Sequence, residues 1–103
     1  MTTSVTDHLV QEVRDLLEVS SVGLYEFTWI LRSLFPDSAD EELRSWASDA
    51  LAQLMTSHDG HLVLLEWPSE DVIGAGPETP PGPSSDVWGE PQDGRSYIAI
   101  IRN

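Results

Sequence analysis

Residues 36–60 read PDSADEELRSWASDALAQLMTSHDG, and residues 61–67 read HLVLLEW. In the first stretch, apolar residues recur at three- and four-residue steps, the spacing of one face of a helix. Ser38 and Glu41 form the S-x-x-E pattern of a capping box, which predicts that this helix begins at Ser38. His58-Asp-Gly60 ends it, and the second stretch has the short run of strand formers closed by proline that is typical of a strand. A helix joined directly to a strand predicts an α+β fold.

Outward from this stretch, the pattern predicts two earlier helices and one later strand. Residues 1–20 contain a weak N-terminal helix, and residues 22–35 contain a helix with a broad apolar face. The last strand covers residues 96–102. We expect three helices followed by a two-stranded antiparallel hairpin that lies on them, because an isolated hairpin is marginal in water. The length of 103 residues allows a single domain: an N-terminal helix in 1–20, a helical core and first strand in 22–68, a loop in 69–94 and the last strand in 95–103.

The segment 69–94 differs in composition from the rest of the chain. It holds five of the seven prolines, five of the seven glycines and six carboxylates, without any positive charge. Such a segment has little apolar surface to offset the entropy of ordering, so we expect a long mobile loop. Two apolar pairs interrupt it, Val72-Ile73 and Val87-Trp88, and each either docks on the domain or stays exposed as a binding anchor.

The composition excludes several classes of protein. The chain has no cysteine, which rules out a disulfide scaffold, a thiol nucleophile and a thiolate metal site. The N-terminal residues lack the basic and apolar regions of a secretory signal, and no apolar run approaches the roughly 20 residues of a membrane span. We therefore expect a soluble, cytoplasmic protein. Five arginines, no lysine and eighteen carboxylates give a formal net charge of -13, which attracts basic partners and repels nucleic acid and anionic membrane.

The order of the elements resembles the end of a winged-helix domain over residues 22–103. A helix, a capped helix with Ala50-Leu51-x-x-Leu54, Gly60, a strand, a long loop and a final strand carry the resemblance. The sequence departs from that pattern between residues 38 and 57, where no glycine or proline breaks the helix. Winged-helix domains usually bind DNA, and DNA binding requires a basic stripe that neutralises phosphates. Because acids outnumber arginines here, we expect no direct binding of nucleic acid.

Motifs for catalysis or cofactor binding are weak. His58-Asp-Gly-His61 places two imidazoles near a carboxylate, yet its spacing matches neither a helical zinc site nor a zinc finger, and a turn accounts for it. Gly74-Ala-Gly76 is followed by proline rather than by a helix, so it is no phosphate loop. We expect no enzyme activity, no cofactor and no metal.

The remaining feature is the acidic charge. It favours a small acidic protein-binding module that covers a basic surface of a partner protein, in the manner of an inhibitor, antitoxin or immunity protein. Trp88 stands among acidic residues, as interface anchors do, and it leads the predicted contact residues: Trp88, Asp40, Glu41, Asp49, Glu70, Asp71, Asp86 and Glu90. The alternative is a winged-helix-like, transcription-associated or dimeric regulatory protein, in which Trp29 or Leu65 contacts a second copy. Plain solubility is the third account of the charge.

Overall fold

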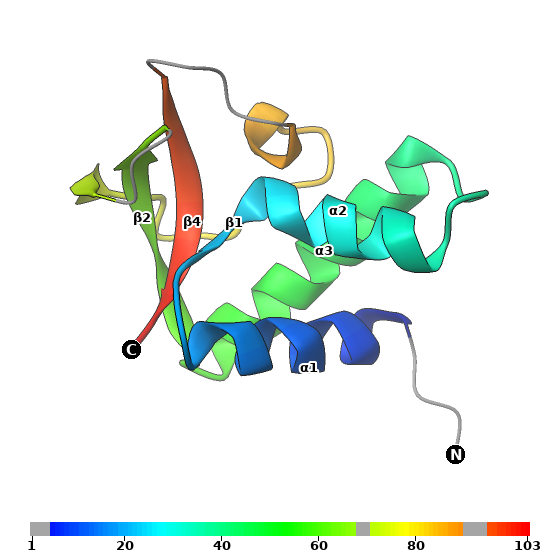
Figure 1. Cartoon of the computed structure of the whole chain (residues 1–103), viewed down its shortest axis with the longest axis horizontal. Helices are drawn as coiled ribbons and strands as arrows, with labels where there is room; N and C mark the ends of the chain where they lie inside the picture. The colour runs from blue at the N-terminus through cyan, green and yellow to red at the C-terminus, as the bar shows by residue number, and fades with distance from the viewer. Residues whose placement is uncertain (1–4, 68–70, 90–94) are drawn as a thin grey trace.

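The computed structural model describes residues 5–67, 71–89 and 95–103. Its elements follow in the order α1 (Val5–Leu17), β1 (Val22–Gly23), α2 (Leu24–Leu34), α3 (Asp40–Thr56), β2 (Gly60–Glu66), β3 (Val72–Ala75), the 3-10 helix η1 (Asp86–Trp88) and β4 (Ser96–Arg102). The three α-helices form one layer and the sheet forms the other (Figure 1). The α+β class expected from the sequence is confirmed.

The sheet has four strands in the order β1-β4-β2-β3, and every neighbouring pair is antiparallel. The two predicted strands pair as expected, from Gly60 opposite Arg102 to Glu66 opposite Ser96. The predicted two-stranded hairpin was too small, because β1 adds to β4 and β3 adds to β2. Both extra strands are very short, with two and four residues, so neither shows a clear alternation of apolar and polar residues.

The two later helices meet at a proline. α2 ends at Leu34, Pro36 follows in a turn, and α3 begins at Asp40. The break between the helices therefore precedes the stretch 38–57, in which the sequence offered none. The predicted capping box at Ser38 is wrong: Ala39 is the N-cap, and no side chain caps the helix. A capping carboxylate occurs instead at α2, where the backbone N–H of Gly23 donates to Glu26 Oε2 at 2.6 Å.

The turn from α3 into β2 has a defined geometry. His58 lies in the left-handed region with φ of 58°. The N–H of Asp59 donates to the carbonyl of Leu54, and the N–H of His58 donates to that of Met55, which is the Schellman pattern at a helix end. Gly60 then passes close to β4, where an added Cβ would lie 2.5 Å from the backbone oxygen of Ile101. Gly60 is therefore required for close strand approach rather than for the helix end.

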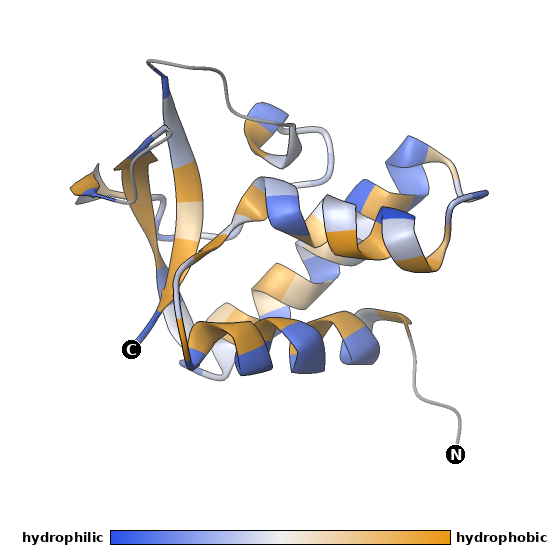
Figure 2. Ribbon diagram, viewed as in Figure 1, coloured by the Kyte–Doolittle hydropathy of each residue, from blue (hydrophilic) through white to orange (hydrophobic). Residues whose placement is uncertain are grey.

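The core lies between the sheet and the helices. Sixteen buried residues from every helix and from β1, β2 and β4 form it. Strand positions alternate: Leu62 and Ile100 face this core, whereas Val63, Leu65 and Ala99 form a smaller buried cluster on the opposite face. Figure 2 shows the consequence, since β2 and β4 are apolar along most of their length while α1 is apolar on one side only.

The predicted loop is partly folded. Val72–Ala75 forms β3, and Asp86–Trp88 forms η1. Three hydrogen bonds attach residues 81–88 to helices α2 and α3: Ser48 Oγ donates to Pro81 O at 3.0 Å, Arg44 Nη1 to Ser85 O at 3.2 Å, and Thr28 Oγ1 to Trp88 O at 3.1 Å. The expectation of a long mobile loop is wrong for these residues, because apolar docking and backbone hydrogen bonds offset the entropy of ordering. Residues 68–70 and 90–94 of that prediction lie outside the described residues.

Candidate protein-binding surface

The acidic charge is concentrated on the helical layer. Residues 5–59 carry eleven carboxylates and three arginines. The three carboxylates of α1, Glu18 just after it and all five carboxylates in residues 37–49 are exposed. Of these, Asp40 is ion-paired with two arginines. The exposed set comprises Asp7, Glu12, Asp15, Glu18, Asp37, Asp40, Glu41, Glu42 and Asp49. These nine exposed carboxylates outnumber the two exposed arginines of this layer, Arg14 and Arg32.

The three arginines of the helical layer are all held by carboxylates of the same layer. Arg14 Nη2 lies 2.9 Å from Asp59 Oδ2, Arg32 Nη2 lies 2.9 Å from Asp40 Oδ1, and Arg44 Nε lies 2.8 Å from Asp40 Oδ2. Each guanidinium is thus ion-paired with a carboxylate of the same chain. Asp40, a predicted contact residue, lies between two of these arginines, Arg32 and Arg44, and its side chain is 54% exposed. Its role as a contact residue therefore stays a prediction.

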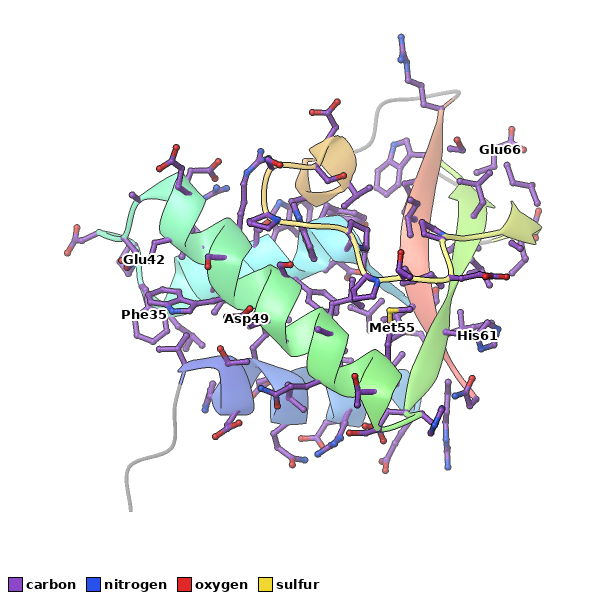
Figure 3. The ribbon with its side chains drawn as sticks, turned by 180° about the vertical axis from the view of Figure 1, so that it is seen from behind. Phe35, Glu42, Asp49, Met55, His61 and Glu66 are labelled. Atoms are coloured by element: carbon purple, nitrogen blue, oxygen red, sulfur yellow. The ribbon has the colours of Figure 1, made fainter. Side chains whose placement is uncertain are left out.

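Glu41 and Asp49, the other two predicted contact residues of α3, are exposed. Glu42, which is also exposed, and Asp49 are both labelled in Figure 3, where α3 lies toward the viewer. Two turns of helix separate them, so they form a stripe rather than a cluster. A stripe of this kind offers several weak, salt-sensitive contacts to a basic surface.

The acidic residues predicted in the loop are dispersed. Asp71 precedes β3 at the sheet edge, whereas Asp86 begins η1, which contacts α2. Both are exposed. Glu70 and Glu90 lie outside the described residues. Asp71 and Asp86 thus belong to different parts of the fold. Asp86 follows Ser85, whose carbonyl accepts from Arg44 of α3, whereas Asp71 lies beside β3.

Trp88 is buried in the core and not available as a surface anchor. Only 2% of it is exposed, its ring centroid lies 5.9 Å from that of Phe27, and its indole Nε1–H donates to Gly82 O at 3.0 Å. The prediction that Trp88 contacts a partner is therefore wrong, and the docking alternative holds. The cause is tertiary: the segment after β3 brings the indole back to α2, where apolar burial outweighs its polar sequence neighbours.

Sequence reasoning named Trp29 of α2 as a contact with a second copy but did not find the groove around it. Glu12 of α1 and Trp29, Ile30, Ser33 and Leu34 of α2 line a shallow groove, named here the α1/α2 groove. Trp29 and Leu34 are each 45% exposed, which is unusual for side chains this apolar. The signal in the sequence was the breadth of the apolar face in residues 22–35, which exceeds what one helix face can bury.

The residues of the His58-Asp-Gly-His61 motif hold the turn after α3 and the C-terminal residue together. His61 Nδ1 lies 2.6 Å from Asn103 Oδ1, and Asn103 Nδ2 donates to His58 O at 2.7 Å. Asp59 is occupied by Arg14. Across residues 5–67, 71–89 and 95–103, no three histidine, aspartate or glutamate side chains gather as they would around a metal ion.

Comparison with known proteins assigns the chain to no family. No protein-family model matches the chain, and no curated protein and no solved structure matches it. Among the described residues, none of the helices combines the length and apolarity needed to cross a bilayer.

Proposed function

We propose that this protein is a small acidic protein-binding module that covers a basic surface of a partner protein, as inhibitors, antitoxins and immunity proteins do. The observation that carries the proposal is the internal pairing of Arg14, Arg32 and Arg44. Each of these arginines is ion-paired at the surface, and the eleven carboxylates of residues 5–59 exceed the three arginines by eight charges.

Such a layer acts first on the rate of encounter. A field of one sign raises the association rate with an oppositely charged surface, and the gain falls as salt screens it. The same field opposes binding to phosphate backbones, which require lysine and arginine. The outer face of α3, the helix that the winged-helix resemblance would direct at DNA, carries Glu41, Glu42 and Asp49. These carboxylates favour a protein partner over nucleic acid.

The test begins with a tagged pull-down from native host lysate at low and moderate salt, followed by binding measurements with the retained protein. Three double variants carry the same charge change: Glu12→Gln/Asp15→Asn on α1, Glu41→Gln/Asp49→Asn on α3, and Glu66→Gln/Glu78→Gln outside the helices as the control. Asp40 is left intact because its loss would release two arginines. We expect one helical variant to slow association severalfold more than the control. Equal effects of all three variants would contradict the proposal, as would retention of only a mixture of basic proteins that moderate salt releases. The charge would then serve solubility.

A second candidate function, a winged-helix-like dimeric regulatory protein, is favoured by the order of the elements and by β3. Helices α2 and α3 separated by a turn, then β2 and β4 paired across a long connection, follow the order on which the resemblance rests. β3 lies at a sheet edge with Val72 57% and Ile73 52% exposed, which provides a strand for a second copy. Leu65, proposed earlier for this contact, is fully buried and is excluded. Molecular mass in solution decides between a monomer and this dimer.

A further inference from the structure

The α1/α2 groove has the composition of a binding hot spot. Trp29, Ile30 and Leu34 provide an apolar floor, and Glu12 and Ser33 provide its polar lining. Tryptophan is the side chain most enriched at positions that dominate binding energy, with polar residues around it. Figure 2 shows apolar segments of α2 beside α1, which is polar on its outer side.

Trp29 is held in a defined orientation. Its ring meets that of Tyr25 edge to face, with centroids 4.9 Å apart and planes at 83°. Tyr25 is itself 8% exposed and has similar edge-on contacts with Trp67 and Tyr97. An indole fixed on a rigid helix loses little entropy on binding, so its contact area contributes to affinity efficiently.

The charge around the groove selects its occupant. Glu12 belongs to the lining, and Leu16, 37% exposed, follows it by one turn on α1 between Asp15 and Glu18. Two basic side chains of α1 are already beside carboxylates: His8 Nε2 lies 3.9 Å from Glu12 Oε1, and Arg14 is engaged by Asp59. A second copy seated here by a twofold axis would oppose the same acidic lining to itself, and like charges close together are unfavourable. A segment with positive charge beside its apolar side chains meets no such repulsion.

We propose that the α1/α2 groove binds a basic amphipathic segment of a partner protein, with leucine-like side chains seated over Trp29 and Leu34 and a lysine or arginine near Glu12. This inference rests on the proposed function and assigns its contact surface. The carboxylates of α3 then contribute to the field rather than to the contact.

The experiment measures fluorescence anisotropy of labelled 18-residue amphipathic peptides on the full chain. One peptide contains leucine and lysine, and a second replaces each leucine with serine at the same charge. We expect the leucine–lysine peptide to bind at least about tenfold more tightly than the serine–lysine peptide, since apolar contact adds to charge. Leu34→Ala and Trp29→Ala should each weaken the leucine–lysine peptide about tenfold.

Ile73→Ala is the matched control, since Ile73 is an aliphatic residue about as exposed as Leu34 but lies on β3. It should leave the peptide affinity unchanged. Equal loss in Leu34→Ala and Ile73→Ala, or equal binding of the two peptides, would overturn the groove while leaving the acidic module in place. Failure of both peptides to bind would count against the acidic module itself. A dimer that Trp29→Ala converts to a monomer would assign the groove to a second copy and overturn the proposal.

Discussion

Two regions of this protein carry a tryptophan in opposite settings. Residues 76–89 are rich in proline and glycine, yet they place Trp88 in the core with 2% exposure. Helix α2 is strongly apolar, yet it leaves Trp29 45% exposed. A helix can bury only the faces that its neighbours cover, whereas an irregular segment can bend until one large side chain reaches the interior. The burial of a tryptophan therefore follows from the packing of elements rather than from its sequence neighbours.

The strongest test of this comparison is Trp88→Ala. The substitution removes a buried indole that contacts Phe27 and leaves a cavity, so we expect a loss of about 3–5 kcal/mol in the free energy of unfolding. Urea denaturation followed by circular dichroism measures it. A loss below about 1 kcal/mol would show that η1 does not dock in solution.

Thr28→Val tests the polar contact beneath Trp88. The Thr28 hydroxyl is buried and lies 2.9 Å from Tyr25 O and 3.1 Å from Trp88 O. Valine keeps the shape and leaves the Trp88 carbonyl without this donor, so the free energy of unfolding should fall by about 2 kcal/mol. Thr28→Ser retains the hydroxyl and serves as the control in the same urea titration. Wild-type stability in the valine variant would contradict the hydrogen bond.

Trp29→Ala should cost less than either change. Nearly half of the residue is exposed, and the edge-to-face contact with Tyr25 is worth about 1 kcal/mol. The measurement is the same denaturation curve, compared directly with that of Trp88→Ala. If the two alanine variants lose equal stability, Trp29 is a core residue and the contrast between the regions fails.

Ser48→Ala should have the smallest effect. It removes one partly buried hydrogen bond to Pro81 O, worth about 0.5 kcal/mol, which corresponds to a decrease of roughly 2–4 °C in Tm for a domain of this size. Differential scanning calorimetry resolves such a shift. A decrease beyond about 10 °C would show that the 81–88 segment depends on this one bond, not on Trp88.

The candidate surface was predicted only in part. Glu41 and Asp49 are exposed as expected, because charged side chains on the polar side of an amphipathic helix stay in water. The pairing of Asp40 with Arg32 and Arg44 was not foreseen, because the two arginines come from two helices whose relative position the sequence does not specify. Trp88 was misjudged because the docking site for its indole is built by Phe27 and Thr28, sixty residues or so away in the chain.

The sequence by itself determined the three helices, the strands around 60–66 and 96–102 and the net negative charge, since hydrophobic period and composition are local properties. Only the tertiary structure decided that β1 and β3 extend the sheet, that residues 81–88 close over α2 and α3, and that Trp29 and Leu34 remain at the surface. Short edge strands gain their stability from partners distant in the chain, and the burial of a side chain depends on which elements cover it. Neither the pairing of a short strand nor the burial of a side chain can be predicted from the neighbouring residues in the sequence.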